Sequence, residues 1–190
     1  MLHAVMLDLA QIAPERPRPI TRAEYNRLVA LGFFDDERVE LLYGVLVEMT
    51  PQDPEHAHPV QVLNKLLLPR LLGRAEVRVQ APFAASDESE PEPDIAVVPP
   101  GDYRKAHPAA AWLIVEVART SQVKDRTVKA RLYAESAVTE YWLVDVPGRS
   151  VEVYRGATAG VYSSVAVRRV GDALHLAQFP DVVLAVDDLF

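Results

Sequence analysis

The chain has 190 residues, of which 27 are Asp or Glu and 20 are Lys or Arg, so its net charge is −7. This acidic balance argues against strong non-specific binding to nucleic acid, which depends on neutralising phosphates with basic side chains. It leaves room for a local basic groove or a bound cation. The absence of cysteine excludes disulfides, thiolate zinc sites and cysteine nucleophiles, and it fits a cytoplasmic protein.

The length predicts a single domain, which we place at residues 21–190. Residues 1–20 contain several prolines and no sustained period, so they are expected to form an N-terminal arm. The first nine residues lack the basic flank and the cleavage site of a signal peptide. No apolar stretch approaches the roughly 18 residues of a membrane helix, so we expect no membrane association.

The first elements along the chain are short. Thr21 and Glu24 form a capping-box pattern that predicts a helix ending near Leu31. Residues 38–44 are interpreted as a helical turn that ends at its glycine, and residues 45–49 as the first strand.

A longer helix is predicted over residues 55–72 from the spacing of its apolar side chains. Pro59 is tolerable in the first turn of this helix, whereas Pro69 is expected to kink or end it. The alternating residues 76–83 predict the next strand. The acidic run that follows, from 87 to 94, is expected to be a solvated loop in which only the last acid matters for function.

The second half of the chain alternates strands with one helix. Residues 94–98 and 112–118 are predicted to be buried strands because they are continuous apolar, β-branched runs. Ser121 or Thr120 can cap a helix over residues 123–136. Further strands are predicted at 140–146, 151–154, 161–170 and 182–186. The expected fold is therefore α/β, with a mixed β-sheet flanked by helices and a β-rich C-terminal tail.

The most informative residue is Glu116, which lies inside the apolar strand 112–118 with no basic residue beside it. A buried, unpaired carboxylate costs several kcal/mol, so it must be protonated, paired through space or bound to a cation. Asp94 opens the preceding strand, and Lys129 lies on the following helix. Two acids on neighbouring strands followed by a lysine predict a divalent-metal site; a structural ion pair of Glu116 is the alternative.

Several motifs occur in a set order along the chain: Glu40–Gly44, Met49–Pro51 followed by His56, Pro91–Asp94, Val115–Val117, the series Ser121, Asp125, Lys129 and Tyr133, and Glu140–Asp145. This ordered set resembles the Uma2 family, a branch of the PD-(D/E)xK nuclease superfamily. The resemblance covers nearly the whole chain. It implies a restriction endonuclease-like core and metal-assisted hydrolysis of DNA phosphodiester bonds.

The resemblance also implies the ligands of the metal. Asp94, Glu116 and the main-chain carbonyl of Val117 would hold Mg²⁺ (or Mn²⁺), a hard cation that prefers oxygen ligands. Such a metal polarises the scissile phosphate and lowers the pKa of an attacking water. Ala118 stands where the superfamily has the lysine of its E-x-K triplet. Relocation of this lysine is typical of the Uma2 branch, and Lys129 is the candidate replacement. The alternative is an ordinary lysine at the edge of the apolar face of its helix, paired with Asp125.

Three further residues receive roles from the resemblance. Glu40 would be an auxiliary acid near the metal, His56 a group near the phosphate or the metal, and Tyr133 a hydrogen-bonding group of the site. Each has a simpler interpretation. Glu40 could be an exposed acid beside Arg38, His56 a surface residue in the first turn of a helix, and Tyr133 a core residue.

Two other functions agree with the sequence. A non-catalytic interaction protein that retains the nuclease-like core would explain the acidic charge and the missing E-x-K lysine. A metal-dependent phosphoesterase acting on RNA or nucleotides would share the site. For the DNA endonuclease we expect a homodimer, because cutting both strands of a duplex takes two active sites and a two-fold axis supplies them.

Overall fold

A six-stranded sheet in the order β3-β4-β5-β6-β7-β8 organises the fold of this computed structural model, which describes residues 14–190. Strands β5 and β6 are parallel, and every other neighbouring pair is antiparallel. The predicted α/β fold with a mixed sheet is thereby confirmed. The strands are β3 (Glu76–Val79), β4 (Ile95–Val98), β5 (Leu113–Ala118), β6 (Glu140–Asp145), β7 (Ser150–Thr158) and β8 (Val161–Arg169).

One face of the sheet is covered by the connection between the two parallel strands, as a parallel pair requires a crossover. Residues 122–135 of this connection are helical and change type twice: α3 (Gln122–Lys124), a π-helical segment η2 (Asp125–Lys129) and α4 (Ala130–Glu135). Its buried side chains pack on the sheet in a cluster rich in aromatic residues, among them Phe83, Tyr133, Tyr141 and Tyr154.

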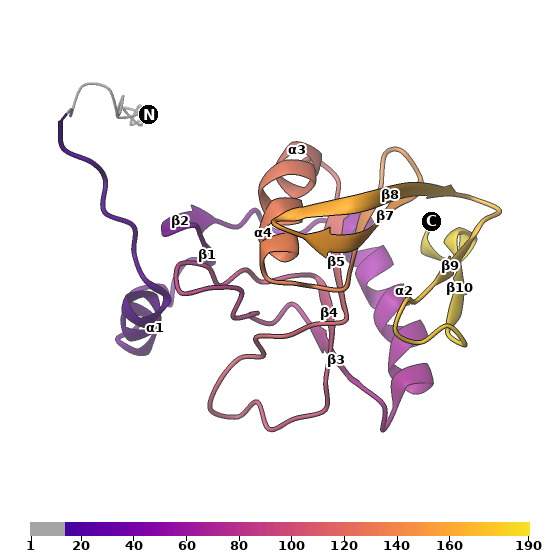
Figure 1. The fold of residues 1–190 in the computed structure, drawn as a ribbon, viewed down its shortest axis with the longest axis horizontal. Coiled ribbons are helices and arrows are strands. Elements are labelled where there is room, and N and C mark those ends of the chain that lie inside the picture. The colour runs from indigo at the N-terminus through magenta and orange to yellow at the C-terminus, as the bar shows by residue number, and fades with distance from the viewer. Residues whose placement is uncertain (1–13) are drawn as a thin grey trace.

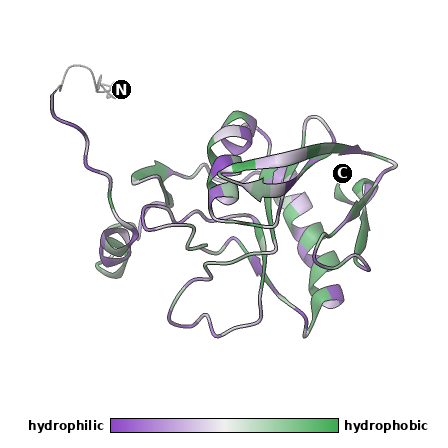
Figure 2. Ribbon diagram, viewed as in Figure 1, coloured by the Kyte–Doolittle hydropathy of each residue, from purple (hydrophilic) through white to green (hydrophobic). Residues whose placement is uncertain are grey.

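The other face is covered by α2 (Pro54–Leu71) together with the C-terminal segment (Figure 1). That segment forms a small hairpin of β9 (Ala173–His175) and β10 (Val183–Ala185), followed by the 3₁₀ helix η3 (Val186–Leu189). Figure 2 shows α2 and this hairpin largely in the hydrophobic colour. Leu63, Leu67 and Leu71 of α2 are fully buried against the sheet.

At the opposite end of the molecule from the C-terminal hairpin lie α1 (Arg22–Ala30) and a second hairpin of β1 (Val39–Leu42) and β2 (Val45–Glu48) (Figure 1). The capping box of α1 is formed as predicted. The prediction of a helical turn at 38–44 is wrong. Tyr43 and Gly44 both have positive φ and make a two-residue hairpin turn, while the short apolar run before them does not by itself distinguish helix from strand.

Other boundaries differ modestly from the predictions. β3 ends at Val79 because Gln80 has a φ of +46°, which breaks the expected strand 76–83. Pro69 lies within the last turn of α2, which ends two residues later. The hairpin strand β9 was not predicted. Most of the expected arm, residues 1–13, lies outside the described part of the chain. Between residues 14 and 190, no helix has the length and apolar character needed to cross a membrane.

Candidate active site

A cavity of about 270 Å³ opens where β1, β4, β5 and the crossover helix meet. Glu40 comes from β1, Asp94 immediately precedes β4, and Glu116 lies in β5. Ile95 pairs with Val115 in the antiparallel β4–β5 ladder, so continuing the register by one residue places Asp94 opposite Glu116. The sheet therefore brings the two predicted metal ligands together.

Lys129 joins two of these acids. Its Nζ lies 2.9 Å from Oε1 of Glu116 and 3.0 Å from Oε2 of Glu40. Tyr133, one helical turn further on, donates its hydroxyl hydrogen to the same Oε1 of Glu116 at 2.5 Å. All four side chains are almost completely buried. Glu40 is thus a strand residue inside the site and not an exposed acid, and Tyr133 is at once a core residue and a hydrogen-bonding partner of Glu116.

The position of Lys129 has a simple geometric origin. Side chains alternate between the two faces of a strand, so Glu116 and Ala118 point to the face that the crossover helix covers. Ala118 is fully buried under that helix. The helix packs on this small side chain and places Lys129 beside Glu116. In the E-x-K pattern the lysine would come from the strand itself, at the position of Ala118.

Asp94 is held by three groups. Its Oδ2 accepts a hydrogen bond from the main-chain N–H of Val117 at 2.8 Å. Its Oδ1 lies 3.0 Å from Nε2 of His56, and the amide of Gln80 donates to it at 3.4 Å. Burial would lower the pKa of His56, but the hydrogen bond and charge of Asp94 raise it above the usual value. The structure therefore places His56 inside the site, against Asp94.

The π-helical segment η2 brings a second lysine into the site. Nζ of Lys124 lies 3.1 Å from Oε1 of Glu40, while Lys129 contacts the other oxygen of the same carboxylate. In a regular α-helix, residues five apart are about 140° apart around the axis. A π turn, which closes i to i+5, brings such residues towards one face. The sequence prediction assumed an α-helix and therefore missed Lys124.

Negative charge exceeds positive charge among the buried groups of this cavity. Burial raises the pKa of the Glu116 carboxyl, against the opposing charge of Lys129, and three surrounding carboxylates raise it further, those of Asp125, Asp94 and Glu40. Burial would lower the pKa of Lys129, but the neighbouring carboxylates raise it well above its usual value, so the ammonium stays charged. Such a cavity favours an additional cation.

The donor set fits a hard divalent metal. Asp94 and Glu116 line the same cavity with carboxylate oxygens, and within residues 14–190 Oε2 of Glu116 accepts no hydrogen bond. The same residues contain no cluster of three or more His, Asp or Glu side chains arranged to hold a metal. A metal here would therefore have few side-chain ligands and keep several waters, which is the habit of Mg²⁺.

Cationic side chains surround the mouth of the cavity. Arg38 and Arg119 both line it and are partly exposed, although each is paired with acids at the rim, Arg38 with Glu92 and Arg119 with Asp53 and Glu55. These guanidinium groups can bind phosphate oxygens through charge-assisted hydrogen bonds. Isolated arginines in loops carry no sequence pattern, so neither arginine could be predicted to belong to the site.

Residues 22–187 match the model of the Uma2 family, which is described as "Putative restriction endonuclease". The chain belongs to the Uma2 family. The fold of this Uma2 protein is similar to the crystal structure of a putative nuclease belonging to DUF820 from Anabaena variabilis ATCC 29413. The TM-score is 0.69 at 20% sequence identity, over 90% of this chain and 98% of the other. No curated protein matches the chain.

Proposed function

We propose that this Uma2 protein is a metal-dependent endonuclease that hydrolyses phosphodiester bonds of DNA. The observation that supports this best is the buried set of Asp94, Glu116 and Lys129 around one small cavity, with more carboxylates than cations. A stable core has no need of such an arrangement, because buried charges cost free energy unless a ligand or function retains them.

The metal would be held by the residues already described. Asp94, Glu116 and the carbonyl of Val117 would bind Mg²⁺ or Mn²⁺, which when bound polarises the phosphate and lowers the pKa of a water. His56 holds Oδ1 of Asp94 and so orients that carboxylate. Tyr133 does the same for Glu116 through its hydroxyl. These two are positioning residues, since each acts through an acid.

Lys129 acts as a cation in this proposal. Its ammonium is charged across the physiological range and therefore does not accept a proton from water. It can instead stabilise the negative charge that develops on the phosphate oxygens in the transition state. Glu40 and Glu116 together keep it in place, with Nζ–oxygen distances of 3.0 and 2.9 Å.

We further propose that the protein acts as a homodimer, with the β-rich tail at the interface. β8 pairs only with β7 in the described sheet, so its outer edge is unpaired. Val161, Val165 and Val167 are exposed along this strand. A two-fold axis beside β8 would cover these side chains and set two active sites against one duplex.

Cleavage of supercoiled plasmid in Mg²⁺ or Mn²⁺ tests the proposed reaction. The wild type should nick or linearise the plasmid, and EDTA should abolish the cleavage. Asp94→Asn should be inactive, whereas Asp188→Asn, the same change at an exposed acid, should cleave like the wild type. Cleavage by Asp94→Asn, or none by a folded wild type on DNA, would refute the assignment; RNA and nucleotide substrates in the same panel identify the phosphoesterase alternative.

A non-catalytic interaction protein is the second candidate. It is favoured by the ion pair between Glu116 and Lys129, which satisfies one oxygen of Glu116 without a metal. Titration calorimetry with Mn²⁺ separates the two functions. Binding that Asp94→Asn abolishes supports the nuclease, and the absence of binding supports the interaction protein.

A further inference from the structure

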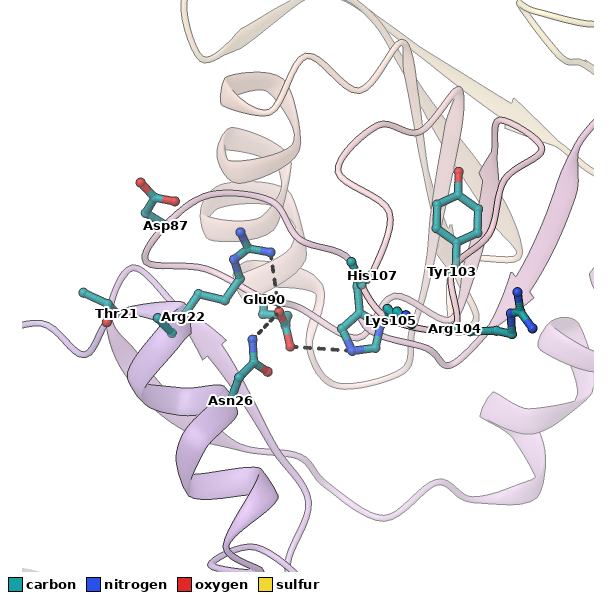
Figure 3. Close-up of a pocket in the computed structure, with 11 residues that line it drawn as sticks. Thr21, Arg22, Asn26, Asp87, Glu90, Tyr103, Arg104, Lys105 and His107 are labelled. Carbon is teal, nitrogen blue, oxygen red and sulfur yellow. Dashed lines mark hydrogen bonds and ion pairs between the residues drawn. The ribbon is translucent and has the colours of Figure 1, made fainter.

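A second, larger cavity of about 720 Å³ lies between α1 and the loop that precedes β5 (Figure 3). It shares no lining residue with the catalytic cavity. Arg22 and Asn26 face it from α1, and His107 faces it from the loop. Glu90 lies between them, on the segment that leads to β4.

Glu90 is buried but poorly satisfied. Only 2% of it is exposed, which contradicts the expectation of a solvated acidic loop. Its Oε2 accepts one hydrogen bond, from Asn26 at 3.3 Å, and lies 3.9 Å from Arg22. Its Oε1 is 4.0 Å from His107 and, within residues 14–190, accepts no hydrogen bond. This oxygen opens to the cavity and has no donor among the described residues, so it is available to a ligand that donates.

The rest of the cavity calls for a different chemical group. Arg22, Arg104 and Lys105 line it alongside Glu90, and only Arg104 is in a close ion pair, with Asp102. A ligand that fits both parts carries hydrogen-bond donors at one end and a negative charge at the other. A nucleotide has this character, since its base offers N–H groups and its phosphate is anionic.

We propose that this cavity binds one unpaired nucleotide of the nucleic-acid substrate, with the donor edge of its base against Glu90. The proposal rests on the nuclease function proposed above. Guanine fits best, because its N1–H and N2–H donors are adjacent and a carboxylate accepts two neighbouring hydrogen bonds. Thymine offers a single N–H on the same edge and fits least well. The base must be unpaired, because in a duplex this edge is occupied by the partner strand.

The backbone connects this cavity to the catalytic one. Glu90 pairs through its main chain with Leu41 of β1, and the neighbouring β1 residue, Glu40, lines the catalytic cavity. Asp94 follows Glu90 by four residues in the sequence, which limits the distance between their Cα atoms to about 14 Å. A nucleotide at Glu90 would therefore lie within a few nucleotides of the phosphate to be cleaved.

Fluorescence anisotropy with short single strands in EDTA tests the proposal without cleavage. The probes are a single strand of eleven thymidine nucleotides and the same strand with a guanosine nucleotide at its centre. The wild type should bind the guanine strand about tenfold more tightly. Glu90→Gln should lose this preference, whereas Glu88→Gln, the same change at an exposed acid on the same segment, should keep it.

The sign of the Glu90→Gln effect is decisive. If the cavity attracted only the phosphate backbone, removing a negative charge would tighten binding to both strands. The proposal requires weaker binding to the guanine strand. Equal affinity of the wild type for both strands, or tighter binding by Glu90→Gln, would overturn it. Neither result depends on plasmid cleavage or on Asp94, so failure here is distinguishable from failure of the nuclease function.

Discussion

Replacing Lys129 with Met removes the central charge of the active-site cluster and keeps an unbranched side chain of similar length. The change breaks two ion pairs, at 2.9 Å with Glu116 and 3.0 Å with Glu40. Glu40, at 0% exposure, is then left as a buried charge, whereas Glu116, whose pKa burial raises to about 8, can take up a proton. Breaking a buried pair from one side costs about 3–5 kcal/mol, because the remaining charge is uncompensated.

The retained contact of Lys124 with Glu40 limits the loss. We therefore expect Lys129→Met to lower the free energy of unfolding at pH 7.5 by about 3 kcal/mol, at the lower end of that range. Lys65→Met, the same substitution at an exposed position of α2, should change it by at most about 0.5 kcal/mol.

The loss of unfolding free energy in Lys129→Met should also depend on pH. Burial would raise the pKa of Glu40, but Lys129 and Lys124 hold it below its usual value. A carboxyl whose folded pKa is depressed stabilises the protein above its unfolded pKa, and this contribution disappears as the pH falls through the folded value. The contribution of the Glu40–Lys129 pair is therefore present at pH 7.5 and declines below about pH 4.5. The difference between the wild type and Lys129→Met should narrow in acid.

Urea unfolding followed by circular dichroism at pH 7.5 and pH 4 measures both quantities. The linear extrapolation is valid if the transition is two-state with an unchanged m value. A loss below about 1 kcal/mol at pH 7.5, or a loss that grows in acid, would show that Lys129 does not neutralise these carboxylates.

Two further predictions concern neighbouring features. Tyr133→Phe removes the hydroxyl that donates to Glu116 at 2.5 Å, and should destabilise the protein by about 1–3 kcal/mol in the same urea assay; no measurable loss would mean that Glu116 does not depend on this bond. Val165→Lys places a charge on the exposed edge strand β8 and should convert the proposed dimer to a monomer in sedimentation velocity, whereas Val123→Lys, at an exposed position of α3, should leave it dimeric. Dimers that persist in Val165→Lys would place the interface elsewhere.

The central strands could be predicted from the sequence because β4 is wholly apolar, β5 is apolar apart from Glu116, and β6 is apolar between its two terminal acids; such runs need both faces covered. The predicted site residues lie together because the register of β4 and β5 sets Asp94 opposite Glu116. The assignment of 38–44 failed because four apolar residues before a glycine fit either type of element, and the positive φ at Tyr43 has no signature in the sequence.

The remaining parts of the site depend on tertiary structure. Lys124 reaches Glu40 only because of a π turn, and no residue in 125–129 is typical of one. Glu90 belongs to a run of acids that composition alone marks as solvated. Its burial follows from the main-chain pairing of that segment with β1, which is a long-range contact.

The π turn lies between the two lysines that contact Glu40, so their positions are fixed by different parts of the helix. Lys129 lies at its end and is fixed by the docking of α4 on the sheet, whereas Lys124 lies before it. Removing one residue between them would restore the α-helical repeat and leave the two lysines four residues apart, about 40° around the axis, so that both could still face Glu40. Keeping the present number of residues in a regular α-helix would instead set them about 140° apart and turn Lys124 away from the cavity. A change from the π turn to an α turn at the present length can thus withdraw one cation from the cavity without disturbing the other, whereas the same change with one residue removed keeps both. The length of the segment, and not only its composition, is therefore an adjustable property of the site.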